Sequence, residues 1–296
     1  MKKFNKVILG MFSFCLMLGV AFLIIGFALG GKFSDMNVNV TDFSEIIKAG
    51  RGNQNGEAVS IDKADLKQNY ATKLNQEENL DISLKQGTII VKQTSGSKLE
   101  VSGNGTASDF AMKEEKNTII IADQRKWSTG LKKIQLVVLI PENYELNQVS
   151  IEARGCDVKL EDGLVANDFS MKCGAGNIEL NNLQIKNKLE MSIGAGDATL
   201  NNCNLNQMKL NCGAGSLDFD GKITGDSKIA CGAGDVELKL EQSLKLYNYK
   251  LDSGIGDIHI GDRSYSGIAN TTTIDNGSSA TFTLQAGIGD IDITGK

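Results

Sequence analysis

Several residues that can do chemistry recur at fixed places in one short motif along the second half of this sequence. The motif reads "CGAGNIEL" from Cys173 and returns as "IGAGDATL", "CGAGSLDF" and "CGAGDVEL". Each copy places cysteine or isoleucine before a Gly-x-Gly corner and a polar residue after it. Thiolates and carboxylates bind metals, thiols form disulfides, and glycine-rich turns hold phosphate, so the motif is compatible with several kinds of site.

The cysteines are interpreted as small core residues rather than metal ligands. None of the six cysteines lies in a CxxC pair, and Cys15 belongs to an uncharged N-terminal run. The slot before the first glycine is expected to point inward, because cysteine and isoleucine share it at Cys173, Ile193, Cys212 and Cys231. If copies stack about 4.8 Å apart, one Cys212–Cys231 disulfide is the alternative to buried thiols. Cys173 would be two copies away from Cys212, which is too far for a bridge.

The glycines and the polar residue after them are interpreted as a structural turn. Glycine tolerates positive φ, and a following Asp or Asn can bond the local backbone. These turn positions are Gly174, Gly176, Asn177, Gly194, Gly196, Asp197, Gly213, Gly215, Gly232, Gly234, Asp235, Gly254, Gly256, Asp257, Gly287, Gly289 and Asp290. A calcium site is the weaker alternative, because each copy offers one such position and Ser216 replaces the acid in one copy. Neither GxGxxG nor GxxxxGK[ST] occurs, which argues against a phosphate loop.

The sequence offers no convergent set of catalytic groups. The single histidine, His259, alternates with Ile258 and Ile260 and is expected to face solvent. A polysaccharide-active enzyme would need two carboxylates in one groove. The pair for that alternative is Glu179 and Asp218, which would lie two coils apart, at about 9.6 Å. We predict that the protein is not an enzyme and that it binds no metal or cofactor.

A period of about 20 residues connects the copies. The first glycines fall at 174, 194, 213, 232, 254 and 287, and Arg154-Gly155-Cys156 reads as a degenerate earlier copy. Within residues 177–193, apolar and polar residues alternate in three short runs, which favours strands over helix. One such unit cannot bury its inward side alone, so the units are predicted to be coils of a parallel β-solenoid. Its core would contain Ile178, Leu180 and Ile193 together with Cys173, Cys212 and Cys231.

Two further features of the repeat region are expected to be structural. Asn181-Asn182 and Asn201-Asn202 recur at an interval of 20 residues, so they are predicted to stack at a corner of the coils. Trp127 falls in a loop and is expected to pack, although an exposed tryptophan can also anchor a partner.

The N-terminal segment predicts a membrane anchor. Residues 7–31 carry no charge and are long enough to cross a bilayer, and Lys2, Lys3 and Lys6 place the N-terminus in the cytoplasm. A signal peptide cleaved near "FALGG" is the alternative. The predicted parts are 1–31, a cytoplasmic tip and transmembrane helix; 32–79, a polar linker with one short helix near 62–77; and 80–296, the β-solenoid.

Composition and charge restrict the partners. The 296 residues are 41% hydrophobic and 23% charged, which is typical of a globular chain, and 33 glycines against one proline indicate many tight turns. The formal charge is −5, and it becomes about −8 without the three N-terminal lysines. An acidic exterior with no basic run argues against binding to nucleic acid.

Several of these features occur together in a known family. The single span, the "LVVLIPENYELNQVSIEA" strands around Pro141 and the serial "GAGDVEL" and "GIGDIDI" coils resemble a bacterial family of β-strand-repeat candidate adhesins of undefined function, which includes LiaG-like envelope proteins. The resemblance covers about residues 80–296. It implies a cell-envelope protein with a β-solenoid ectodomain, often near envelope-stress regulators, and it implies no catalytic residues.

The expected function follows from the anchor, the repeat and this resemblance. We expect a non-catalytic protein on the outer side of a bacterial plasma membrane that serves adhesion, scaffolding or sensing, with an envelope or membrane protein as its partner. The alternative is an accessory component of envelope-stress signalling that acts through a membrane partner. The sequence leaves the ligand and self-association open.

Overall fold

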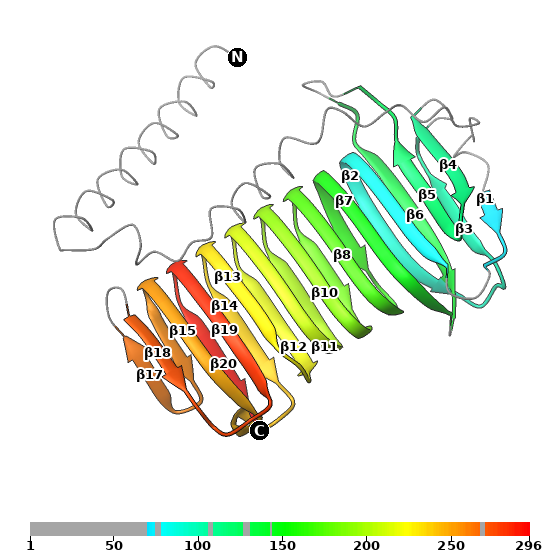
Figure 1. Cartoon of the computed structure of the whole chain (residues 1–296). Helices are drawn as coiled ribbons and strands as arrows, with labels where there is room; N and C mark the ends of the chain where they lie inside the picture. The colour runs from blue at the N-terminus through cyan, green and yellow to red at the C-terminus, as the bar shows by residue number, and fades with distance from the viewer. Residues whose placement is uncertain (1–69, 75–77, 106–108, 127–130, 143, 267–269) are drawn as a thin grey trace, which may run out of the picture. The chain divides into compact units, whose positions relative to one another are not determined.

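The fold is built almost entirely from β-strands. The computed structural model describes residues 70–74, 78–105, 109–126, 131–142, 144–266 and 270–296. In these residues the chain forms one continuous sheet of 20 strands, wound into stacked coils, and one short 3-10 turn, η1 (Leu244–Leu246) (Figure 1). None of the helices in the described residues could span a membrane. The predicted transmembrane segment, residues 7–31, lies outside them.

Parallel pairing between coils forms the middle of the stack. Its strands are β7 (Glu145–Leu160), β8 (Leu164–Ala175), β9 (Ile178–Asn181), β10 (Leu183–Ala195), β11 (Ala198–Ala214), β12 (Leu217–Ile223), β13 (Ser227–Ala233) and β14 (Val236–Leu240). Each neighbouring pair is parallel, as the sequence predicted for a solenoid. The all-β, solenoid-like architecture is therefore confirmed.

Each middle coil contributes to three faces. The first face consists of the segments that precede the Gly-x-Gly corner, such as 169–173 and 189–193, and the second face consists of those that follow it, such as 198–200 and 217–219. A short third face joins them, formed by 145–146, 164–166, 183–185, 203–205 and 221–223. The corner of β7 is in register with the later corners, because Gly155 pairs with Ala175. Arg154-Gly155-Cys156 therefore occupies the place of a Gly-x-Gly corner.

The coils do not stack in the order of the sequence. Sequential stacking predicts that the copy at Gly287 follows the copy at Gly254. Instead β19 (Ala280–Ile288) lies between β13 and β15 (Tyr247–Ile255), and β20 (Ile291–Gly295) lies between β14 and β16 (Asp257–Ile260). The antiparallel strands β17 (Arg263–Ser266) and β18 (Asn270–Ile274) then pair with β16 and β15. The copy at Gly254 thus becomes the last coil, and its edges are covered by strands that belong to no coil.

The other end of the stack is also covered by antiparallel strands. The first coil is β2 (Asn79–Thr94), which pairs with β7 on one side and with β5 (Thr118–Asp123) and β6 (Ile134–Pro141) on the other. Three antiparallel strands lie beyond these: β4 (Phe110–Glu115), β3 (Leu99–Gly103) and β1 (Tyr70–Thr72). The prediction of a helix near 62–77 is wrong for Tyr70–Thr72, because pairing with β3 makes this segment a strand; residues 62–69 and 75–77 lie outside the described part.

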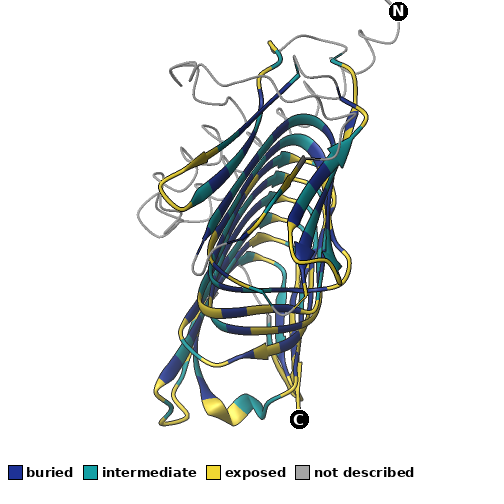
Figure 2. Ribbon diagram, turned by 90° about the vertical axis from the view of Figure 1, so that its right-hand side faces the viewer, coloured by how far each residue is buried: buried dark blue, intermediate teal, exposed yellow. Residues whose placement is uncertain are grey.

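The core is a continuous column of inward side chains between the faces. Buried and more exposed residues alternate along the strands (Figure 2), as period-two sequence alternation requires. The structure places all six predicted core residues in this column, each at most 4% exposed. They are Cys173, Ile178, Leu180, Ile193, Cys212 and Cys231.

An aromatic cluster closes the core where the third face ends. Within the described residues this face ends where Leu240 and Glu241 pair with Gly221, and η1 then leads into β15. The Tyr247 ring stacks on Phe282 with centroids 4.4 Å apart, and the Tyr247 hydroxyl donates a hydrogen bond to the Ile223 carbonyl at 2.6 Å. Burial raises the pKa of Tyr247 to about 12, so the hydroxyl stays a donor at neutral pH.

Candidate functional site

The Gly-x-Gly corner is where each coil approaches its neighbour most closely. A Cβ on the first glycine, as at Gly194, would lie 2.4 Å from the Gly174 carbonyl oxygen. A Cβ on the second, as at Gly196, would lie 2.0 Å from the Gly176 oxygen, and here φ is also +130°. Both glycines are therefore required by close packing. Positive φ was expected at both, but among the predicted glycines it occurs at the second of each pair only, at Gly176, Gly196, Gly215, Gly234, Gly256 and Gly289.

The aspartates after the glycines connect one coil to the next. Asp197 Oδ1 accepts a hydrogen bond from the Ser216 backbone N–H at 2.9 Å. In the same way Asp235 Oδ1 accepts from the Asp290 N–H at 3.0 Å, and Asp290 Oδ1 accepts from the Asp257 N–H at 2.8 Å. The sequence predicted a bond within the residue's own corner. The observed bonds cross between coils, because the in-register stack brings the next N–H directly beneath each carboxylate.

The described cysteines are free and buried. Cys212 and Cys231 are direct register partners, whereas Cys173 is separated from Cys212 by Ile193. A hydrogen bond to Cys231, together with burial, raises the pKa of the Cys212 thiol. Burial also raises the pKa of Cys173 and of Cys203 to about 11. These thiols stay protonated near neutral pH and are poor nucleophiles and poor metal ligands.

One straight row of outward side chains runs along the second face. In register order it contains Lys159, Glu179, Thr199, Asp218, Glu237, Asp292 and His259. Lys159 lies 3.5 Å from Glu179, and His259 Nδ1 lies 3.0 Å from Asp292, with all four side chains 43–54% exposed. Thr199 separates Glu179 from Asp218. The row is solvated and partly ion-paired, unlike the desolvated carboxylate pairs of glycosidases.

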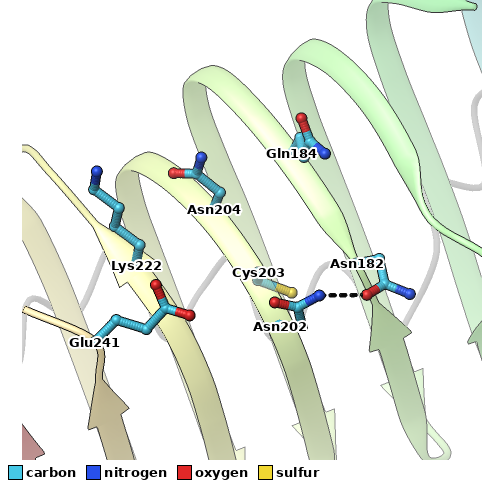
Figure 3. A pocket seen from close by; sticks show the side chains of 7 residues that line it. All are labelled: Asn182, Gln184, Asn202, Cys203, Asn204, Lys222 and Glu241. Atoms are coloured by element: carbon cyan, nitrogen blue, oxygen red, sulfur yellow. Dashed lines mark hydrogen bonds between the residues drawn. The ribbon is translucent and has the colours of Figure 1, made fainter. Parts of the chain in front are cut away.

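A polar hollow lies at the border of the second and third faces. We call it the amide hollow; its volume is about 260 Å³ (Figure 3). It is lined by Asn182, Gln184, Asn202, Cys203, Asn204, Lys222 and Glu241. A volume of this size accommodates about one sugar ring or one short side chain, because sites for drug-sized ligands begin near 300 Å³.

Two asparagines form one wall of the amide hollow. Asn182 and Asn202 stand at equivalent corners with left-handed φ values of 56° and 52°, a conformation that asparagine tolerates better than most residues. Asn202 Nδ2 donates to Asn182 Oδ1 at 2.6 Å, and Asn201 Nδ2 donates to Asn181 Oδ1 at 2.9 Å. The asparagine stack thus forms at the corner where the sequence placed it. The Asn202–Asn182 bond leaves Asn182 Nδ2 and Asn202 Oδ1 for other partners.

The third face and the loop after β14 supply the rest of the amide hollow. Gln184, Asn204 and Lys222 occupy successive register positions, so their side chains lie in one outward row (Figure 3). Glu241 reaches the same place because its N–H continues the ladder by donating to the Gly221 carbonyl at 2.8 Å. The lining offers amide donors and acceptors, one ammonium and one carboxylate, which suits binding to hydroxyl or amide groups.

Sequence reasoning did not single out Gln184, Asn204, Lys222 or Glu241. The sequence does show that Gln184 and Asn204 are outward residues at equivalent places in two successive copies of the repeat. Their meeting with Lys222 and Glu241 depends on the register of β12 and on the end of the third face. Trp127, the other binding residue considered, lies outside the described residues.

Comparison with known proteins gives one family match. The model of the family described as Toastrack DUF4097 matches the chain twice, over residues 77–188 and 184–294. No curated protein matches. Similar solved structures include a candidate adhesin from Bacteroides fragilis, with 16% identity, a TM-score of 0.49 and coverage of 76% of this chain and 96% of that one.

Two other solved structures are similar over the same part of the chain. A candidate adhesin from Parabacteroides merdae has 10% identity and a TM-score of 0.44, with 77% of this chain and 95% of that one covered. A candidate lipid-binding protein from Parabacteroides distasonis has 14% identity and a TM-score of 0.42, with 77% and 96% covered. Likenesses at this level carry no argument about a ligand.

Proposed function

Because the chain belongs to the Toastrack DUF4097 family, we propose that it is a membrane-anchored, non-catalytic interaction protein of the bacterial cell envelope. The observation that carries this proposal is the amide hollow. Most of its lining side chains stand on paired strands, and its amides, one ammonium and one carboxylate can form hydrogen bonds to a ligand. Its only thiol, Cys203, is a protonated donor to the Leu180 carbonyl at 3.7 Å.

The chain's charge pattern supports an anchored protein with its coils outside the cell. The uncharged run 7–31 follows three lysines, which favours a cytoplasmic N-terminus. The alternative is a signalling role that acts through a membrane partner, and replacing the span would abolish that role while leaving the coils intact.

The proposed location predicts selective labelling at the cell surface. Ser279 is exposed, whereas all five described cysteines are buried. In a Cys15→Ser background, we expect a Ser279→Cys variant to react with a membrane-impermeant maleimide in intact cells, and the background chain to react only weakly. Gel mobility of the labelled full-length chain measures this. Labelling that requires permeabilised cells would place the coils in the cytoplasm and contradict the proposal.

The non-catalytic role predicts that envelope glycans remain intact in contact with the protein. The full-length chain, solubilised in detergent, would be incubated with isolated cell-wall glycan, and reducing ends would be assayed over time. We expect no release above a heat-treated control, because the carboxylates of the outer row are solvated. Release that disappears in a Glu179→Gln/Asp218→Asn variant would instead support the polysaccharide-active alternative.

A further inference from the structure

The first face carries a second hollow, which we call the lysine hollow. Its volume is about 200 Å³, and it lies over β8, β10 and β11. Its polar lining forms two rows of three side chains across the strands. Ser170, Glu190 and Lys209 are register partners in one row, and Lys172, Ser192 and Asn211 are register partners in the other.

The charges in the lysine hollow leave two ammonium groups available. Glu190 forms an ion pair with Lys188, which lies outside the lining. This hydrogen bond holds the pKa of Glu190 below its usual range, with further attraction from Lys209 and Lys172. In the described part of the chain neither Lys172 nor Lys209 forms an ion pair. The hollow therefore has an excess of positive charge.

Asn211 adds an unsatisfied acceptor to the same hollow. Its side chain lies on the outward side of the sheet, yet the residue is only 6% exposed. Its Oδ1 atom is buried and has no hydrogen-bond partner. Buried carbonyl oxygens are rarely left unpaired in folded proteins, so this atom could accept a hydrogen bond from a bound ligand.

We propose that the lysine hollow binds an oxyanion, phosphate or carboxylate, carried on a hydroxyl-bearing chain. Lys172 and Lys209 neutralise the anion from two diagonal positions of the two rows. Asn211 Oδ1 accepts a hydrogen bond from a neighbouring ligand hydroxyl, and the Ser170 and Ser192 hydroxyls complete a polar surface. The ligand class is an anionic polyol or sugar. The site uses none of the residues of the amide hollow, and it does not depend on where the protein lies in the cell.

Paired small probes test the ligand class. The full-length chain in detergent would be titrated by calorimetry with glycerol 3-phosphate and with galacturonate, and with glycerol and galactose as their uncharged counterparts. We expect at least one anionic probe to bind about 10-fold more tightly or better than its counterpart, and the tighter of the two shows whether phosphate or carboxylate is preferred. Equal binding of charged and uncharged probes in both pairs would overturn the proposal.

Variants test the site itself. We expect Lys172→Gln/Lys209→Gln to weaken binding of the preferred anion about 10-fold or more, and Asn211→Asp to weaken it similarly by adding a like charge. Lys250→Gln is the matched control, because Lys250 is exposed in the same row, three strands beyond Lys209. It should change affinity less than about 2-fold.

Two outcomes would overturn the site assignment. One is an equal loss of affinity in Lys250→Gln, which would show non-specific attraction to the face. The other is full affinity in the double lysine variant. Because Asn211 is buried, an unfolding curve is measured for each variant. If Asn211→Asp fails to fold, Asn211→Ala replaces it. We expect Asn211→Ala to weaken binding of the hydroxyl-bearing anions while its melting temperature stays near that of the parent chain.

Discussion

At Gly196 the backbone φ is +130°, and a Cβ would lie 2.0 Å from the carbonyl oxygen of Gly176. The same pair of constraints recurs at Gly215 and Gly234. Adjacent coils can continue their hydrogen-bond ladder around this corner only because no side chain stands between them; for example, the Gly196 N–H donates to the Ala214 carbonyl at 3.0 Å. The motif is thus repeated because every coil packs its corner against a neighbouring coil in the stack.

A pair of glycine substitutions separates backbone strain from steric overlap. Gly277 also has positive φ, +71°, but a Cβ there meets nothing within 4 Å. We expect Gly277→Ala to cost about 1–2 kcal/mol of unfolding free energy, from strain alone. Gly196→Ala should cost at least about 1–3 kcal/mol more, because it also displaces the neighbouring coil. Denaturant unfolding followed by circular dichroism measures both; equal costs would mean that the corner relaxes freely.

At the scale of elements, the first coil holds its corner by charge instead of glycine packing alone. Its corner residues Lys85 and Gln86 stand where later coils have Gly-x. The Asp123 carboxylate accepts the Lys85 backbone N–H at 2.9 Å and the Arg125 Nε–H at 2.9 Å, and Arg125 Nη2 donates to the Gln86 carbonyl at 3.3 Å. The side chains of Asp123 and Arg125 are almost fully buried, so their hydrogen bonds have to compensate for the cost of removing these charges from water.

The inserted strands β19 and β20 give a prediction that a sequential solenoid would not. A chain that ends at Ser279 lacks the coil between β13–β14 and β15–β16. We therefore expect residues 247–260 to lose their parallel partners and become sensitive to limited proteolysis, while residues 145–223 stay protected. Mass spectrometry of the fragments measures this against the full chain. Continued protection of residues 247–260 would indicate that β15 can pair directly with β13.

At the scale of the whole β-unit, the two ends are covered and the faces differ in charge. Strands outside the coil pattern pair with both terminal coils, which limits edge-to-edge association. The second face presents acidic residues such as Asp218, Glu237 and Asp292 in its central row. The first face instead presents Lys172 and Lys209 around its hollow. The amide and lysine hollows therefore offer different chemistry on different faces.

The sequence by itself determined the period, the corner and the inward alternation. Cys173, Ile178 and Ile193 could be assigned to the core because burial on a strand follows a local period of two. The need for glycine was also visible, although its cause at the first glycine is contact between coils rather than φ.

Only the tertiary structure decided which coils are neighbours and which outward residues meet. The copies at Gly254 and Gly287 have the same alternation and the same Gly-x-Gly-Asp corner, so the local sequence of either copy is suited to pair with β13. Their order is set by strand pairing between distant parts of the chain, which places β19 and β20 between β13–β14 and β15–β16. For the same reason the meeting of Lys222 with Glu241, and of Lys172 with Asn211, follows from strand register and not from spacing along the chain.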